Sequence, residues 1–194
     1  MSVLTGIIAG ILIAASHLSA STITFEGFVD STNLTNQVPG VVLANAIVLS
    51  AGNSLNEFEF PPRSGVNVIS DSGSPLQIQF FSSQSAFTAY VTYLQPLAIQ
   101  AFDAGSNLIG SIGTRAGCTS NLALSGTPTC LPNELIQLTG VGAISRVTIS
   151  GDPSGGSFVL DDLGLETSGV PEPATFALAA TAMLAFCLRR FRLK

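Results

Sequence analysis

The chain has 194 residues, of which only 10% are charged, and its mean hydropathy of +0.51 is concentrated in its two ends. Between Glu26 and Glu166 the sequence carries eleven acidic residues against three arginines. An acidic surface repels phosphate backbones, and no basic patch offsets it, so nucleic acid is excluded as a partner.

The N-terminus reads as a signal peptide. An apolar run of 13 residues, Val3 to Ala15, is followed by a polar patch and by small residues at 19–21. This run has the length of a signal-peptide apolar region and is too short for an ordinary membrane-spanning helix. We therefore predict a signal peptide over residues 1–20, although no Lys or Arg precedes the run. The alternative is that the run forms a buried helix or strand of the domain.

Residues 21–169 are expected to form an all-β extracytoplasmic domain. Short alternating or apolar segments are divided by Gly, Pro, Asn and Ser clusters, without convincing helical periodicity. Their regular spacing, with turn signals at 103–107 and 152–156, predicts a β-sandwich. Alternation at 77–80 and 146–149 predicts strands with one buried and one wet face. The expected strands are 22–25, 41–49, 77–81, 87–93, 97–102, 108–112, 135–139, 145–150 and 157–165.

The three cysteines divide into a pair and a single residue. Cys118 and Cys130 enclose a loop rich in Gly, Pro and Thr, and an exported location is oxidising, so we predict a disulfide between them. Closing such a loop contributes about 3 kcal/mol in the chain-entropy treatment. Cys187 lies in the apolar C-terminal run and is expected to remain unpaired.

Catalytic chemistry has little support in this sequence. The single histidine, His17, lies in the predicted signal peptide, which removes His-based catalysis and the usual zinc sites from the domain. Glycosidases can use two carboxylates, and Glu57 and Glu59 would share a face of a strand. Trp is absent, however, and Tyr90 and Tyr93 would point to opposite faces of a strand, so a sugar-stacking platform is not evident. We expect no enzymatic activity, and we assign no catalytic residues and no required cofactor.

The C-terminal segment, residues 170–194, has three parts. A motif is followed by an apolar run at 174–188 and by a basic end at 189–194. The apolar run predicts a transmembrane helix, although fifteen residues reach only about 22 Å of a roughly 30 Å hydrocarbon core. The basic end places the C-terminus in the cytoplasm and the domain outside. A soluble amphipathic helix, the alternative, would need a polar face, which the run lacks. The motif residues are Val170, Pro171, Glu172 and Pro173, and the basic residues are Arg189, Arg190, Arg192 and Lys194.

This order of proline-glutamate-proline, apolar helix and arginine-rich end resembles the PEP-CTERM sorting signal, over residues 170–194. The resemblance implies that an exosortase, an integral-membrane enzyme of Gram-negative bacteria that make exopolysaccharide, recognises the tail and cuts near the motif. It also implies a single pass through the inner membrane before processing, and then a location on the cell surface or outside the cell. The body resembles that of many PEP-CTERM proteins in its segments 24–26, 60–65, 101–108 and 158–163.

The body is also similar in pattern to carbohydrate-binding jelly rolls, in which a carboxylate near the first strand and an Asp of the last strand can hold a structural calcium ion. Carried over, these ligands are Glu26 with Asp161 or, as a second choice, Asp162. The alternative is that the two aspartates face solvent or bind N–H groups of loops. The expected function is a non-catalytic exported surface or matrix protein associated with exopolysaccharide or biofilm. The alternative function is a carbohydrate-binding module with structural calcium.

Overall fold

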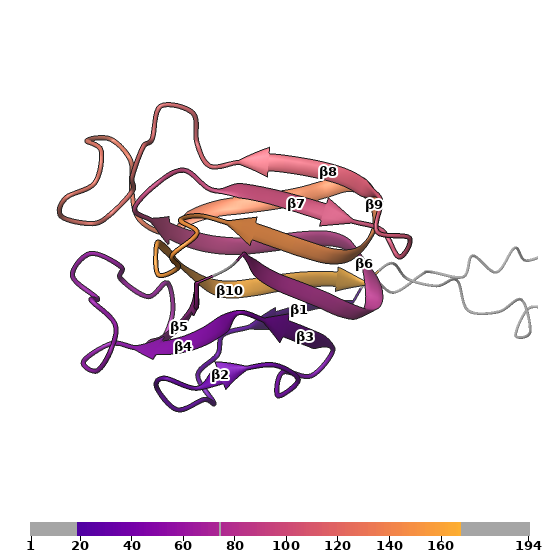
Figure 1. Ribbon diagram of the computed structural model, residues 1–194, viewed down its shortest axis with the longest axis horizontal. Coiled ribbons are helices and arrows are strands. Elements are labelled where there is room, and N and C mark those ends of the chain that lie inside the picture. Colours follow the sequence, from indigo (N-terminus) through magenta and orange to yellow (C-terminus); the bar gives the residue numbers. More distant parts are fainter. Residues whose placement is uncertain (1–18, 74, 168–194) are drawn as a thin grey trace, which may run out of the picture. The chain divides into compact units, whose positions relative to one another are not determined.

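The computed structural model describes residues 19–73 and 75–167, which form ten β-strands (Figure 1). The described residues contain no helix, and hence none that is long and apolar enough to cross a membrane. The all-β class is confirmed, whereas the sorting tail, its transmembrane helix and all but the end of the predicted signal peptide lie outside the described residues. The strands are β1 (Ser19–Ile23), β2 (Asn33–Leu34), β3 (Val41–Ala44), β4 (Ala46–Ser50), β5 (Asn67–Asp71), β6 (Leu76–Tyr93), β7 (Ala98–Phe102), β8 (Leu108–Gly113), β9 (Glu134–Ser150) and β10 (Phe158–Thr167).

Strands β6 and β9 are long and bent, and each takes part in two layers. The strands expected at 77–81 and 87–93 are the two halves of β6, and those expected at 135–139 and 145–150 are the two halves of β9. The first half of β6 pairs with β3 and with the second half of β9. Its second half pairs with β10 and with the first half of β9. Register shifts at 79–86 place a bulge at the bend of β6.

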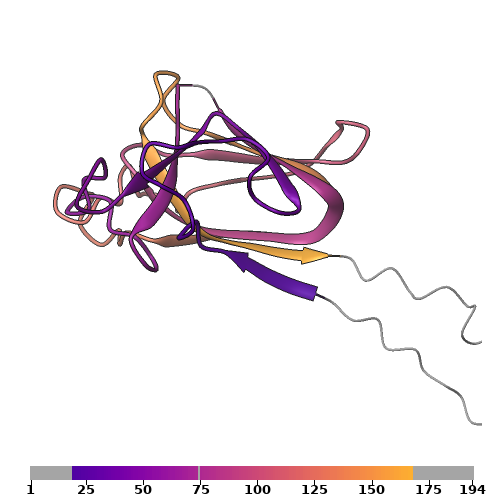
Figure 2. The same ribbon diagram turned by 90° about the horizontal axis from the view of Figure 1, so that it is seen from below.

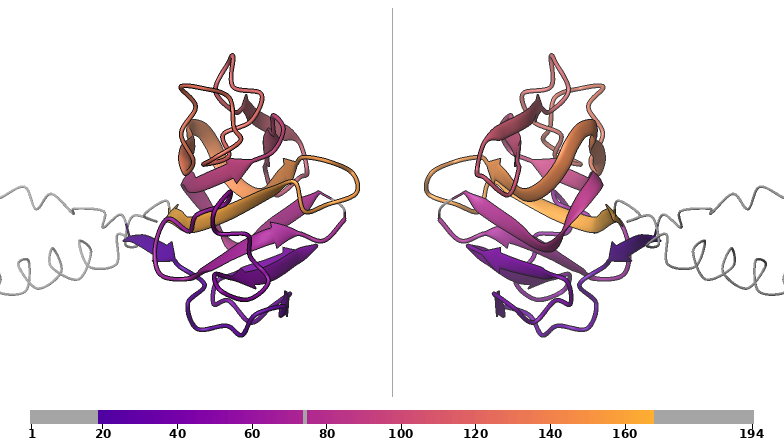
Figure 3. Two further views of the ribbon diagram at one scale, coloured as in Figure 1. Left: turned by 90° about the vertical axis from the view of Figure 1, so that its left-hand side faces the viewer. Right: turned by 90° about the vertical axis from the view of Figure 1, so that its right-hand side faces the viewer.

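Because of these bends, one continuous hydrogen-bonded sheet forms two facing layers (Figures 1 and 3). One layer contains β3, the first half of β6, the second half of β9, β7 and β8. The other contains β2, β4, β5, β10, β1, the second half of β6 and the first half of β9. The rings of Phe80 and Phe87, from the two halves of β6, lie 6.4 Å apart in the shared core. The arrangement is therefore β-sandwich-like, as the sequence predicts.

Three features of the strands differ from the prediction. The strand expected at 22–25 is β1, which ends at Ile23, and Phe25 has a φ of 63°. The segment expected as one strand at 41–49 is divided into β3 and β4 at Asn45, whose φ of 58° interrupts the extended backbone. Strands β2 and β5 are additional to those expected. Every residue of β5 is buried, because the loop at 51–66 covers its outer face, so its sequence lacks the apolar and polar alternation of a half-exposed strand.

The entry and exit of the domain lie side by side, because β1 pairs with the end of β10 and Ser19 is opposite Thr167 (Figure 2). Cleavage after Ala20 would therefore remove the first two residues of β1. The long loops at 51–66 and 114–133 lie at the other end of the strands (Figure 1). Residues Ser19–Ser168 form one compact unit whose core lies within it, which is what an independently folding domain requires.

Candidate functional site

The two long loops are joined to each other at one end of the sandwich. Glu59 accepts hydrogen bonds from the backbone N–H groups of Leu124 and Ser125, both at 3.1 Å. The side chain of Asn133 donates to the carbonyl of Pro61 at 3.1 Å. The segment that contains Glu57 and Glu59 is a turn, so these carboxylates do not stand side by side on a strand. Glu59 connects two loops here, and the expectation of no enzymatic activity stays a prediction.

Two carboxylates distant in sequence hold consecutive N–H groups of the segment 63–67. Glu26 accepts from Val66 at 3.1 Å and from Asn67 at 2.9 Å. Asp161 accepts through Oδ2 from the N–H groups of residues 63 and 64, at 2.8 and 2.9 Å. Between these pairs lies Gly65, with a φ of +55°, where an added Cβ would come within 2.2 Å of the Glu26 carboxylate carbon. A glycine is therefore required where the loop passes over this side chain.

Asp161 and its neighbour Asp162 have different environments. Asp161 is 1% exposed, and its Oδ1 accepts from the Asp162 N–H at 2.7 Å. Burial raises the pKa of Asp161 in spite of its backbone donors. Asp162 has a φ of 47° and accepts the hydroxyl hydrogen of Ser64 at 2.7 Å. The structure contains the alternative that the sequence left open for Asp161, because its carboxylate binds N–H groups of a loop.

The arrangement of Glu26 and Asp161 does not form a cluster of ligands for the predicted calcium ion. Glu26 and Asp161 reach the same loop, but their oxygens face N–H groups, whose partial positive charge is the wrong sign beside a cation. Among residues 19–73 and 75–167, no group of three or more acidic, His or Cys side chains could hold a metal ion. Calcium at Glu26, Asp161 or Asp162 stays a prediction.

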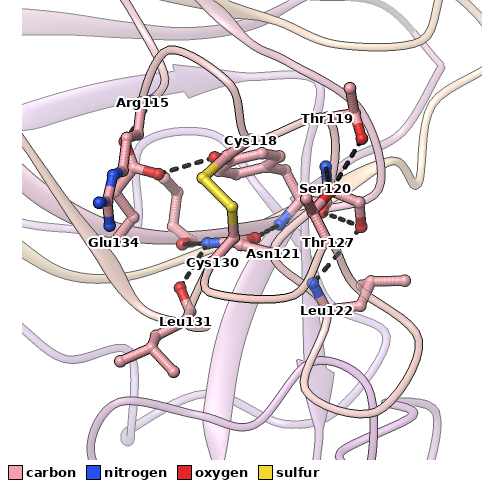
Figure 4. Close-up of a disulfide and its surroundings, with 12 residues drawn as sticks. Arg115, Cys118, Thr119, Ser120, Asn121, Leu122, Thr127, Cys130, Leu131 and Glu134 are labelled. Carbon is pink, nitrogen blue, oxygen red and sulfur yellow. Dashed lines mark hydrogen bonds between the residues drawn. A yellow bond between two sulfur atoms is a disulfide. The ribbon is translucent and has the colours of Figure 1, made fainter.

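The predicted disulfide between Cys118 and Cys130 is present, with Cα atoms 5.8 Å apart (Figure 4). Asn121, fully buried within the enclosed loop, accepts from the N–H of Tyr93 at 2.6 Å. Its amide donates to the carbonyls of Val91 and Leu131 at 3.0 and 3.1 Å. This side chain fastens the disulfide loop to β6. Sequence reasoning missed it, because one Asn in a loop rich in Ser and Thr gives no distinguishing signal.

A hollow of about 230 Å³ lies beside the disulfide and is lined in part by Arg115, Leu131 and Glu134. Both oxygens of Glu134 accept hydrogen bonds at 2.7 Å, one from the backbone of Arg115 and one from the hydroxyl of Tyr93. Burial, together with the bond to Glu134, raises the pKa of Tyr93 to about 12. Tyr93 is fully buried, whereas Tyr90 lies on the outer face beneath the guanidinium of Arg63, at 4.5 Å. The two tyrosines thus point to opposite faces, as predicted.

The outer face of the layer containing β7 and β8 carries amide, hydroxyl and guanidinium groups in register. Two rows cross β6, β9 and β7, and every inward neighbour of these residues is buried. The Arg146 guanidinium lies 4.4 Å from the Phe102 ring centroid. We call this surface the amide face. Its first row is Gln79, Arg146 and Phe102, and its second row is Gln77, Thr148 and Gln100.

The solved structures described below share little sequence with this chain. No curated protein shows significant similarity to the chain. A DUF4465 family protein from Bacteroides caccae is 11% identical, with a TM-score of 0.46, and the match covers 77% of this chain and 100% of that one. A C-terminal family 22 carbohydrate-binding module from Clostridium thermocellum is 12% identical, with a TM-score of 0.38, covering 78% of this chain and 93% of the module. A cleaved adhesin domain of Lys-gingipain from Porphyromonas gingivalis is 12% identical, with a TM-score of 0.36, covering 78% and 99%.

The C-terminal segment matches a family model. Residues 169–192 match the family model of the PEP-CTERM protein-sorting motif. The match begins one residue before the segment distinguished from the sequence and includes Pro171, Glu172, Pro173 and the arginines after the apolar run. The chain therefore carries a PEP-CTERM sorting motif, as its resemblance to that signal predicted, and this match supports its assignment as an exosortase substrate.

Proposed function

We propose that the chain is a non-catalytic exported protein, sorted by exosortase to the cell surface or the extracellular matrix, where its β-domain associates with exopolysaccharide or biofilm. The sorting motif at residues 169–192 carries this proposal. The disulfide supports it, because structural disulfides persist in oxidising, extracytoplasmic locations. In this proposal the tail crosses the inner membrane once, with its basic end in the cytoplasm, until exosortase cuts near the motif.

Mass spectrometry of the mature protein from its own host tests the proposal. We expect the wild-type protein to lose the tail near residues 170–173, and to keep it both in a strain without exosortase and in the Glu172→Ala variant. Glu166→Ala is the matched control, since this carboxylate is exposed on β10 and lies outside the motif. An identical processed mass with and without exosortase would contradict the proposal.

The amide face favours a second function, carbohydrate binding. Glutamine side chains both donate and accept hydrogen bonds, as sugar hydroxyls do, and Phe102 adds a ring to the same surface. Affinity electrophoresis of residues 19–168 through gels that contain polysaccharide tests this function. We expect retardation that Gln79→Ala and Gln100→Ala weaken and that Gln137→Ala, on the outer face of the other layer, leaves unchanged. Equal migration with and without every polysaccharide would remove this second function.

Structural calcium belongs to this second function and has its own test. If Glu26 and Asp161 bind calcium, residues 19–168 melt at a higher temperature in millimolar calcium than in chelator, and Asp161→Asn abolishes the difference. A wild-type melting temperature that is the same in calcium and in chelator would remove the calcium site and leave the rest of the proposal standing.

A further inference from the structure

A buried acceptor without a donor lies at the bend of β6. Gln84 is 3% exposed, and its amide Nε2 donates to the carbonyl of Ser82 at 2.5 Å, which fixes the orientation of the amide. Its Oε1 has no hydrogen-bond partner among the described residues. Leaving such an oxygen unpaired in the folded protein costs about 1–3 kcal/mol. The oxygen is closed to solvent in this conformation, so a molecule would be stabilised here if the side chain turned and the molecule donated a hydrogen bond to this oxygen.

Gln84 lines a hollow of about 160 Å³. Ser21 and Ser82 contribute hydroxyl groups, and Pro39 and Leu165 contribute apolar surface. Among the described residues that line it, none has a charged side chain. A water molecule takes up about 30 Å³, so the hollow has room for several waters or for one small ring. A neutral site with few polar groups and apolar walls suits an uncharged ligand that bears hydroxyl groups.

Phe81, at the rim of the hollow, is 70% exposed. An aromatic ring presented to solvent beside a hydrogen-bonding amide offers both surfaces that a pyranose uses, a flat C–H face and polar hydroxyl groups. A wholly polar ligand would leave the ring without a contact, and a wholly apolar ligand would leave Gln84 without a donor. The two side chains together therefore favour a sugar ring.

Phe81, which lines the hollow, lies on the same strand as two residues of the amide face. Gln77, Gln79 and Phe81 occupy alternate positions of β6, about 6.7 Å apart, and point out of the same layer. The N–H of Phe81 donates to Gly40 at 3.0 Å, which extends the pairing of β6 with β3 as far as this residue. A sugar polymer that lies along the outer face of β6 would thus arrive at the hollow.

We propose that the Phe81–Gln84 hollow binds one uncharged sugar unit of a polysaccharide that lies along the amide face. The inference rests on the polysaccharide association proposed above and specifies its chemistry. The ring of the sugar stacks on Phe81, and the Gln84 side chain turns toward the hollow so that Oε1, which is buried in the unbound structure, accepts a hydrogen bond from a sugar hydroxyl. The domain carries eleven acidic residues against three arginines between Glu26 and Glu166, so it repels acidic polymers and selects neutral ones.

Isothermal titration of residues 19–168 with β-1,4-linked hexasaccharides of glucose, xylose and galactose, and with a galacturonate hexasaccharide, tests the inference. We expect a neutral probe to bind more tightly than the galacturonate. Phe81→Ala should weaken that binding about tenfold or more, as truncation of an aromatic anchor does. Phe58→Ala is the matched control, since this ring is also 70% exposed but lies outside the hollow, and it should leave affinity within about twofold of wild type. Gln84→Met removes the acceptor at similar volume and should weaken binding too.

The outcomes separate the hollow from the wider proposal. If Gln79→Ala weakens binding while Phe81→Ala and Gln84→Met do not, the hollow is refuted and polysaccharide association stands. Tighter binding of the galacturonate would refute the neutral-sugar assignment. If no probe binds, both the hollow and the carbohydrate function fail, whereas exosortase sorting is judged separately by the mass of the mature protein.

Discussion

Replacing Asp161 with Asn tests whether one buried carboxylate holds the loop at 63–67. The substitution keeps the size of the side chain and changes only its hydrogen-bonding capacity and its charge. In the native protein both oxygens accept: Oδ2 from the N–H groups of Arg63 and Ser64, and Oδ1 from that of Asp162. An Asn has a single acceptor, so its NH₂ group must face at least one of these N–H donors.

The free-energy cost follows from this mismatch. In its better orientation the Asn side chain keeps the bonds to Arg63 and Ser64 and loses the one to Asp162. A hydrogen bond to a charged group contributes about 1.5–3 kcal/mol, and an unpaired buried donor costs about 1–3 kcal/mol. Removing the charge returns part of this, because burial opposes ionisation of Asp161 and raises its pKa. We expect a net loss of about 2 kcal/mol in the free energy of unfolding, or about 4–8 °C in melting temperature for a domain of this size.

Urea denaturation of residues 19–168 at neutral pH measures this loss from the shift of the midpoint at constant m-value. Asp162→Asn is the matched control, because its neighbouring carboxylate has one side-chain partner and a positive φ that Asn tolerates well. We expect it to stay within about 0.5 kcal/mol of wild type. Equal losses of stability in the two variants would refute the claim that the Asp161 carboxylate holds the loop at 63–67.

Three further predictions concern the loop end of the domain. Replacing both Cys118 and Cys130 with Ala should lower the free energy of unfolding by about 3 kcal/mol in urea, and no loss would contradict a stabilising crosslink. Gly65→Ala places a Cβ in a position with a φ of +55° and 2.2 Å from a carboxylate carbon, so it should cost about 1–3 kcal/mol, whereas Gly27→Ala, with open space around it, should cost less. A variant whose only tyrosine is Tyr93 should show no phenolate absorbance until the pH approaches 12, and ionisation near pH 10 would contradict its burial against Glu134.

The strands that sequence predicts well are those with one wet face. At 77–81 and 145–150 the alternation of apolar and polar residues is the direct record of a half-buried strand, and both segments are strands in the structure. The same rule fails for Asn67–Asp71. The preceding loop covers the outer face of this strand, so both faces are buried and the sequence shows no alternation of apolar and polar residues. The rule also predicts two separate strands where β6, and likewise β9, is one bent strand. Local periodicity stops there because a bulge changes the side-chain direction.

The candidate site residues differ in whether the sequence alone could predict them. The sorting motif is a contiguous stretch, so it can be recognised from the sequence alone, and the family match covers it. The pairing of Cys118 with Cys130 was also predictable, because the body contains only these two cysteines. The amide face and the hollow depend on register between strands that are far apart in the chain, such as Gln79 opposite Arg146. No local pattern specifies such a pairing.

The acidic composition of the domain has a structural origin as well as an electrostatic consequence. Eight of the eleven acidic side chains between Glu26 and Glu166 accept hydrogen bonds from backbone N–H groups of turns, loops or strand ends. They are Glu26, Asp30, Glu59, Asp71, Asp103, Glu134, Asp152 and Asp161.

The described residues form no helix, and their long loops contain N–H groups that no strand pairs. A carboxylate is the strongest acceptor that a side chain offers to such groups. The carboxylates at these positions thus already accept hydrogen bonds from the backbone of the domain. A ligand for the exported domain is better sought where polar atoms still lack partners. Among the side chains of the described residues, the buried oxygen of Gln84 is such an atom, and Gln84 is one of the residues that line the hollow beside Phe81.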